Sequence, residues 1–241
     1  MAKAAESKLL KELRAELSKV SDPKKASQMQ AYMKSKMPYH GVPAPIVKKV
    51  CRKLFSEIEI SDFETWRNHV LDLWRKAKFR EERYGALYFA GISRAKSYQT
   101  FEAMDTYEEM IVTGAWWDYV DDIAIHRVGT VLANHPKPTQ SLMLSWSRSP
   151  DIWKRRSSII CQIGAKEKTK LDFLYKCIEP SMESDEFFLR KAIGWALRQV
   201  ARRDPDEVVR YVKSNHKRLS PLSKREALKN LIKEGKITAV P

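Results

Sequence analysis

The sequence predicts an all-α protein, and three observations indicate this fold class. Only 8 of the 241 residues are glycine, the residue other than proline that most disfavours a helix interior. Apolar residues recur at intervals of three and four along nearly the whole chain, without convincing strand alternation. Helix starts also align in a weak internal repeat. We therefore expect an α-solenoid of antiparallel helix pairs, forming a single domain over residues 1–241 with about 1–6 and 236–241 disordered.

Turn-forming residues divide the chain into helices of about 10 to 18 residues, an ordinary length for packed helices. The breaks fall at 22–23, 38–45, 61–62, near 97, 113–114, 134–138, 149–150, near 168, near 183, 204–205 and 220–221. The longest connection that we expect is PYHGVPAP, residues 38–45.

The internal repeat aligns five helix starts: REERYGALYFAGI (80–92), WDYVDDIAIHRVG (117–129), WKRRSSIICQIG (153–164), FLRKAIGWALRQVA (188–201) and LSKREALKNLI (222–232). Taking Arg83, Asp121, Arg156, Lys191 and Arg225 as equivalent gives spacings of 38, 35, 35 and 34 residues. Equivalent positions of a solenoid form a column along its concave face, so the four basic residues would make a track for a phosphate backbone. A solvated column of charge is the alternative, and spacing alone does not decide between them.

The charge balance indicates a polyanionic partner. Lys and Arg number 45 against 30 Asp and Glu, a formal net charge of +15 that is spread along the chain. Nucleic acid fits better than membrane, because no apolar run has the length of a spanning helix and the N-terminal segment is unlike a signal peptide. We expect an intracellular protein and, without a coiled-coil pattern, a monomer.

Cysteine and histidine give no sign of a metal site. Cys51, Cys161 and Cys177 are far apart and form no Cys-x-x-Cys pair, so we expect buried thiols. The five histidines are dispersed, without a pair at helical i, i+4 spacing. We expect neither a metal nor a cofactor.

The segment GAWWDYVDDIA, residues 114–124, concentrates acid within this basic chain. A helix that begins at about Ala115 would place Trp117 and Asp121 on one face, because four residues leave a net offset of about 40°. Asp118 would lie in the first turn, where the helix dipole favours an acid, and Asp122 would be solvated about 100° away. Asp121 has no such structural reason, so it is the candidate for chemistry.

Two of the seven tryptophans are candidates for a binding site. Trp117 shares a face with Asp121, and Trp195 lies one helical turn after Lys191. Two indoles beside one carboxylate would suit a flat cationic group, although they could equally stack bases without catalysis. The others have core-like spacing: Trp66, Trp74, Trp116, Trp146 and Trp153.

Four motifs resemble the AlkD-type DNA alkylation repair family, alkylpurine DNA glycosylases built of HEAT-like repeats. They are TGAWWDYVDDIA, SPDIWKRRSSII, EFFLRKAIGWALRQVARRDPDEVVRYV and LSPLSKREALKNL, within a resemblance that covers about 25–232. The resemblance implies a catalytic set of Trp117, Asp121, Arg156 and Trp195, and it makes Tyr32 a DNA-facing tyrosine. The segment KEKTKLDFLYK and the N-terminal helix match less well.

The implied activity is removal of purines alkylated at N3 or N7 from double-stranded DNA, without extruding the base. Such a base is already cationic, so positive charge develops on the sugar as the bond breaks. Asp121 would stabilise that charge and orient water, the indoles of Trp117 and Trp195 would add cation–π contacts, and Arg156 would hold a phosphate. We expect Arg156 and the basic track to outweigh burial and hold the pKa of Asp121 down.

Two alternatives without chemistry remain open. A helical-repeat scaffold could bind nucleic acid with Trp117 and Trp195 acting only as stacking platforms. A repeat protein could also bind acidic protein partners through the same surface. A base-release assay on Asp121→Asn separates the enzyme from the scaffold.

Overall fold

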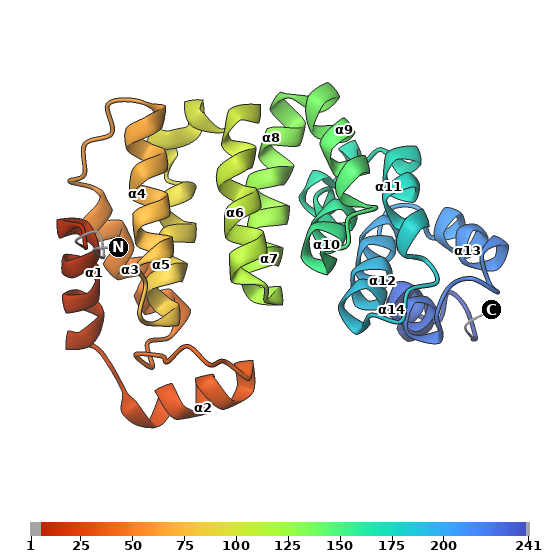
Figure 1. Cartoon of the computed structure of the whole chain (residues 1–241). Coiled ribbons are helices and arrows are strands. Elements are labelled where there is room, and N and C mark those ends of the chain that lie inside the picture. The colour runs from red at the N-terminus through yellow and green to blue at the C-terminus, as the bar shows by residue number, and fades with distance from the viewer. Residues whose placement is uncertain (1–5, 240–241) are drawn as a thin grey trace. The chain divides into compact units, whose positions relative to one another are not determined.

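The computed structural model describes residues 6–239, and these residues form helices and turns without a β-strand (Figure 1). The predicted all-α fold class is confirmed. The chain divides into two compact units, one ending at Gln99 and the other starting at Thr100. That the whole chain behaves as one domain stays a prediction.

The first unit holds six helical segments. They are α1 (Lys8–Lys19), α2 (Pro23–Met33), α3 (Ala44–Phe55), α4 (Phe63–Arg75), α5 (Arg80–Ala90) and the 3-10 helix η1 (Ser93–Tyr98). Ser7, Asp22 and Asp62 begin α1, α2 and α4, because each side chain accepts a hydrogen bond from a free first-turn amide. Helices α4 and α5 pack together along their length.

A buried carboxylate holds the PYHGVPAP connection in place. Glu81 of α5 is fully buried and accepts hydrogen bonds from the amides of His40, Gly41 and Val42 at 2.9, 2.9 and 3.0 Å. Gly41 has a positive φ of 82°, and a Cβ there would lie 2.0 Å from the carbonyl oxygen of Asp22. Only glycine fits this crossing, which fixes where α2 leaves the unit.

A second buried carboxylate ties α1 to α5. Glu82 receives two hydrogen bonds from Arg14, at 2.6 and 2.9 Å, and one from the amide of Lys78 at 2.7 Å. His40 lies 3.4 Å from the same carboxylate. These donors lower the pKa of Glu82 to about 2 in spite of burial, which opposes them.

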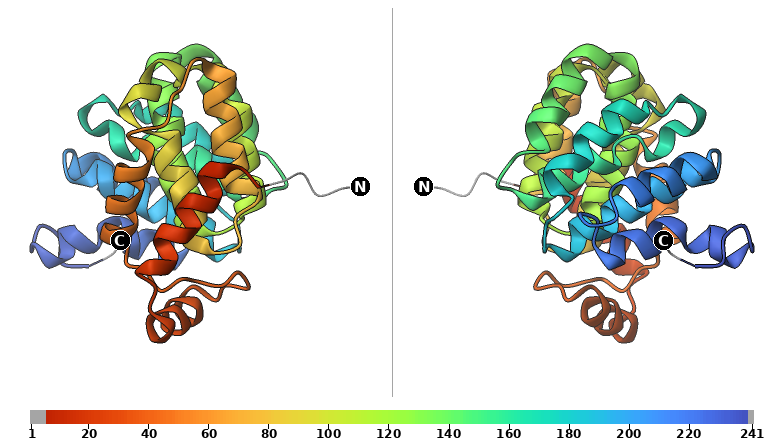
Figure 2. Two further views of the ribbon diagram at one scale, coloured as in Figure 1. Left: turned by 90° about the vertical axis from the view of Figure 1, so that its left-hand side faces the viewer. Right: turned by 90° about the vertical axis from the view of Figure 1, so that its right-hand side faces the viewer.

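The second unit contains the candidate motifs. Its segments are η2 (Phe101–Ala103), α6 (Met104–Gly114), α7 (Trp117–Asp122), η3 (Ile123–Val128), α8 (Gly129–Asn134), α9 (Pro136–Trp146), α10 (Ile152–Ile160), η4 (Ile163–Lys168), α11 (Leu171–Ile178), η5 (Glu179–Ser181), α12 (Phe187–Ala201), α13 (Pro205–Ser214) and α14 (Pro221–Lys233). Helices α7, α10, α12 and α14 follow one another in contact, and α12 lies against α14 (Figures 1 and 2).

Most predicted breaks coincide with helix ends, and one start differs. Pro136, Pro205 and Pro221 are the first residues of α9, α13 and α14, where a missing amide proton costs nothing. Helix α7 begins at Trp117 instead of about Ala115, because Ala115 adopts a left-handed conformation (φ 43°) that ends α6.

One feature of the second unit was not predicted. The residues Ile123–Val128 after α7 form a π-helix, η3, which continues directly into α8. A π-helix is wider than an α-helix, is rare, and occurs frequently at functional sites. It begins two residues after Asp121.

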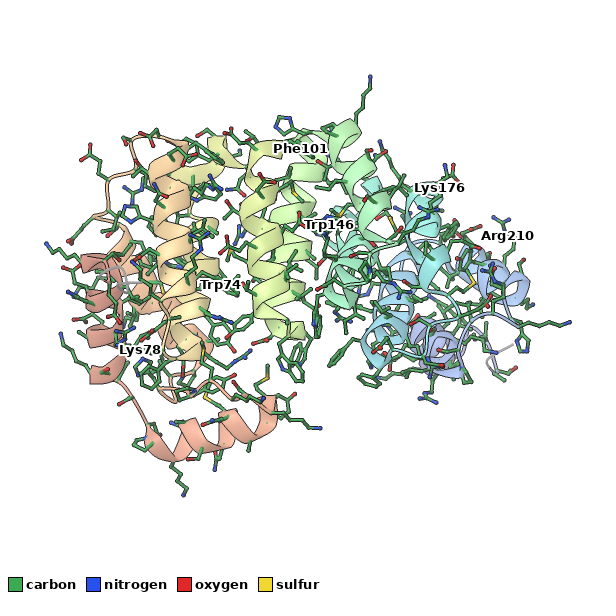
Figure 3. The ribbon with its side chains drawn as sticks, in the orientation of Figure 1. Trp74, Lys78, Phe101, Trp146, Lys176 and Arg210 are labelled. Atoms are coloured by element: carbon green, nitrogen blue, oxygen red, sulfur yellow. The ribbon has the colours of Figure 1, made fainter. Side chains whose placement is uncertain are left out.

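Four of the seven tryptophans lie in the core, and Figure 3 labels two of them, Trp74 and Trp146. Trp66, Trp74, Trp146 and Trp153 are at most 7% exposed, as predicted. The three cysteines are buried free thiols, also as predicted.

The disorder expected at the termini is not seen where these residues are described. Glu6 forms ion pairs with Arg14 and Lys78, at 2.6 and 2.8 Å. At the other end, Ile237 packs against the core of the second unit. Residues 1–5 and 240–241 lie outside the described part.

Candidate active site

A bidentate ion pair joins α7 to α10 in the second unit. The guanidinium of Arg156 donates from Nε to Oδ1 of Asp121 at 2.7 Å and from Nη2 to Oδ2 at 2.8 Å. Its Nη1 donates to the carbonyl oxygen of Phe188, in the first turn of α12, at 2.6 Å. Three consecutive helices of the stack therefore meet at one guanidinium, which holds the carboxylate in a fixed orientation.

This geometry corrects the position expected for Arg156. We expected an exposed member of the basic track, but the Arg156 side chain is 5% exposed. The alignment of repeats could not show that the acid of one repeat would pair with the base of the next. The Asp121 side chain keeps 15% of its surface exposed.

Aromatic rings form a wall beside the pair. Trp116 lies 5.6 Å from Phe188 and 6.2 Å from Trp153, and Trp153 lies 5.0 Å from Phe188, as ring centroids. The side chain of Asp151 accepts hydrogen bonds from the amides of Trp153 and Lys154 and so fixes the start of α10. Of these rings, Phe188 contacts the pair directly, since its ring centroid lies 6.0 Å from the guanidinium carbon of Arg156.

Burial has the larger effect on the acidity of Asp121. Loss of water raises the pKa of its carboxyl above the ordinary value; Arg156 opposes this rise, and the charge of Asp118 adds to it. Our expectation that Arg156 would hold this pKa down was wrong, because the burial of the carboxyl, not only its partner, sets the balance.

The other residues of the acidic segment differ in their surroundings. Trp117 is the first residue of α7, half-buried and one turn before Asp121, and Asp118 lies in the first turn as predicted. Asp122 was expected on a solvated face but is half-buried, and burial raises its pKa.

Trp195 and Lys191 lie on α12. Trp195 is half-buried and packs against the core of the second unit, and it follows Phe188 by two turns, on nearly the same face. Lys191 is not free: its Nζ lies 3.0 Å from Oε1 of Glu226 on α14. Arg225, next to that acid, is exposed.

Two predicted DNA contacts belong to the first unit. Tyr32, on α2, is 79% exposed, the largest exposure among the described large apolar and aromatic side chains. Arg83, on α5, stacks over the ring of Trp74 at 4.6 Å. The second unit brings together Asp121, Arg156 and the start of α12.

Sequence reasoning missed Phe188, Phe187 and Glu226. The carbonyl oxygen of Phe188 binds Arg156, and a backbone acceptor leaves no signal in a sequence. Phe187 is 57% exposed at the start of α12, where FF in the motif EFFLRKAIGW could have been noticed. Glu226 directly follows Arg225, and only an alignment of helix faces would have placed it opposite Lys191.

Within residues 6–239 no group of three or more His, Cys, Asp or Glu side chains could hold a metal ion. None of the helices in this part is long and apolar enough to cross a lipid bilayer.

Comparison with known proteins assigns a family to this arrangement. The family model described as "DNA alkylation repair enzyme" matches residues 13–231. A solved structure, "Predicted DNA alkylation repair enzyme from Enterococcus faecalis", is 30% identical with a TM-score of 0.79, covering 88% of this chain and 96% of that one. No curated protein matches significantly. The all-helical fold and the likeness to this solved structure place the chain in the class of α-solenoid proteins. The chain is a member of the DNA alkylation repair enzyme family.

Proposed function

We propose that the protein is a DNA glycosylase that hydrolyses the N-glycosidic bond of purines alkylated at N3 or N7 in double-stranded DNA. The observation that carries this proposal is the half-buried Asp121 carboxylate, oriented by Arg156, with Trp117 one turn earlier on the same helix. Family membership supports a role in alkylation repair.

The chemistry needs little from the protein beyond electrostatics. An alkylated purine is cationic, so it leaves with the electron pair of the broken bond as a neutral base, and positive charge develops on the deoxyribose. Arg156 occupies one edge of the Asp121 carboxylate, and the exposed remainder would face the sugar and orient the attacking water. The oxygen of this water adds to C1′, and the proton that it loses passes to the carboxylate and on to solvent. The indoles of Trp117 and Trp195 would stabilise the cation through their π faces.

Arg156 acts here as the residue that positions the carboxylate. All three of its nitrogens already donate hydrogen bonds, so binding a DNA phosphate would compete with the ion pair or use its outward N–H groups. Contacts with phosphate fall to Lys191, Arg225 and Arg83, with Tyr32 against the duplex. A monomer acting inside the cell, without a cofactor, is part of the same proposal.

Release of single bases under single-turnover conditions tests the proposal. Duplexes that carry one 7-methylguanine or one 3-methyladenine should lose the base, whereas a duplex with uracil or hypoxanthine should not, because the proposed mechanism assigns no residue to protonate a neutral leaving base. Comparable release of uracil would contradict the mechanism. Tight DNA binding without release of any base would identify a non-catalytic scaffold.

A further inference from the structure

A carboxylate on α14 gathers three cations beside Trp195. Glu226 binds Lys191 through Oε1 at 3.0 Å and Arg198 through Oε2 at 2.6 Å, and Lys229 lies 3.3 Å from Oε2. The Glu226 side chain is 13% exposed. Its cationic partners lower its pKa to about 2, so it carries its full charge at neutral pH.

The backbone holds this acid close to α12. A Cβ on Gly194 would lie 2.4 Å from Cβ of Glu226 and 2.8 Å from the carbonyl oxygen of Ser223, so a side chain there would push α14 away. Arg198 also donates to the carbonyl oxygen of Glu226 at 2.9 Å. The acid is therefore placed by a close helix crossing that only glycine allows.

The cations lie on the face of α12 that leads to Trp195. Lys191, Trp195 and Arg198 are spaced i, i+4 and i+7, which puts them within about 60° of one another around the helix. Glu226 thus binds Lys191, one turn before Trp195, and Arg198, one turn after it. These two cations flank the indole that we propose to contact the sugar.

We propose that Glu226 is a specificity-determining residue, which tethers Lys191 and Arg198 and thereby weakens binding of undamaged DNA beside the excision site. The inference rests on the proposed function. A free cation contributes to duplex affinity through counterion release whether or not a lesion is present. A cation paired with a carboxylate must weaken or break that ion pair before it can bind a phosphate. It therefore adds less to the affinity for undamaged DNA.

The repeat offers a matched pair of cations for comparison. Arg225 occupies the position equivalent to Lys191 in the next repeat, is exposed, and has no carboxylate partner among the described residues. If the tether acts as proposed, Lys191→Gln should reduce the salt dependence of duplex binding clearly less than Arg225→Gln, whose loss should approach the roughly 0.9 expected for one phosphate contact. Equal changes would overturn the proposal.

The direct test is Glu226→Gln, which removes the charge and keeps the shape. Binding of an undamaged duplex should tighten severalfold at low salt, and its logarithmic salt slope should steepen by about 0.9 for each freed cation that reaches a phosphate. Excess undamaged DNA should also inhibit base release more strongly than in the wild type. The control Glu179→Gln changes net charge equally at an exposed acid that pairs with Arg218.

Unchanged or weaker binding by a folded Glu226→Gln variant, or the same gain in Glu179→Gln, would overturn the inference. Thermal unfolding reports whether Glu226→Gln folds, and if it does not, the comparison of Lys191→Gln with Arg225→Gln decides alone. The binding measurements need no excision. A wild type that releases no base would therefore refute the proposed glycosylase and leave the tether to be judged separately.

Discussion

The carboxylate of Asp121 and the guanidinium of Arg156 face each other edge to edge, joined by hydrogen bonds of 2.7 and 2.8 Å. Asp121 neutralises the charge of the buried Arg156, and Arg156 fixes the orientation of the Asp121 carboxylate. Removing either partner leaves an unpaired charge in a poorly hydrated site, which lowers the free energy of unfolding. The function of Asp121 must therefore be tested with its stability in view.

Asp121→Asn should reduce base release by roughly 10² to 10³, the scale for loss of one preorganised electrostatic group. The amide keeps an acceptor for Arg156, and thermal unfolding measured in parallel separates lost catalysis from lost folding. Asp118→Asn, three residues earlier on α7, should be much milder. Equal losses in two folded variants would refute the assignment of Asp121.

The pH dependence should follow the ionisation of Asp121. Burial raises its pKa above 3.8, so the carboxylate is protonated, and excision lost, as the pH falls through a value higher than that of an ordinary Asp. Asp118→Asn removes a charge that raises this pKa, and should move the acidic limb to lower pH. Single-turnover rates on a 7-methylguanine duplex, measured across the acidic range, locate the acidic limb of the wild type and that of Asp118→Asn. If the acidic limb of the pH profile is at the same pH in Asp118→Asn as in the wild type, the ionisation that controls excision belongs to a group other than Asp121.

Loss of an indole should weaken excision in proportion to the cation–π contact. Trp117→Ala and Trp195→Ala should each cost about 0.5 to 2 kcal/mol, roughly 2- to 30-fold in rate, with Phe at either position intermediate. Comparison of base release with duplex affinity distinguishes a contact to the cation from simple stacking. A variant that loses only affinity would support the scaffold.

The buried network of the first unit should make its stability depend on pH. Glu82 has its pKa lowered to about 2 from 4.5, so its contribution is complete above the unfolded value and lost as the pH falls toward 2. Glu82→Gln should lower the free energy of unfolding by about 3 kcal/mol near neutral pH, and the gap to wild type should narrow in acid.

Thermal or denaturant unfolding at several pH values measures this gap. Glu16→Gln is the matched control, since Glu16 is an exposed acid of α1 that pairs with Lys19. A gap that stays constant down to pH 2 would contradict the assigned role of Glu82.

The fold could be predicted from sequence because helix starts are local. Proline at the first position and acidic or hydroxyl caps are read from neighbouring residues, and the breaks at Asp62, Pro205 and Pro221 coincide with helix starts. Asp121 was singled out by the same means, through its spacing from Trp117. Whether it takes part in chemistry stays a prediction.

The partners of the candidate residues could not be predicted, because they come from other helices. Nothing near Arg156 in the sequence indicates that its charge meets Asp121, 35 residues earlier, or that Lys191 meets Glu226, 35 residues later. The burial of a side chain also depends on the other helices that pack around it. The sequence therefore could not show that the pKa of Asp121 would be raised and not lowered.

The π-helix from Ile123 to Val128 changes the angular positions of the side chains on either side of it around the helix axis. Each residue of an α-helix advances by about 100°, whereas a wider turn advances by less, so the residues before and after η3 are out of step. A helical wheel drawn from Trp117 through Leu132 would put the acid and the core residues of α8 in the wrong relation. Because a π turn holds one residue more than an α-helical turn, deleting one residue of η3 would give a regular helix that still keeps Asp121 toward Arg156 and Val131 in the core.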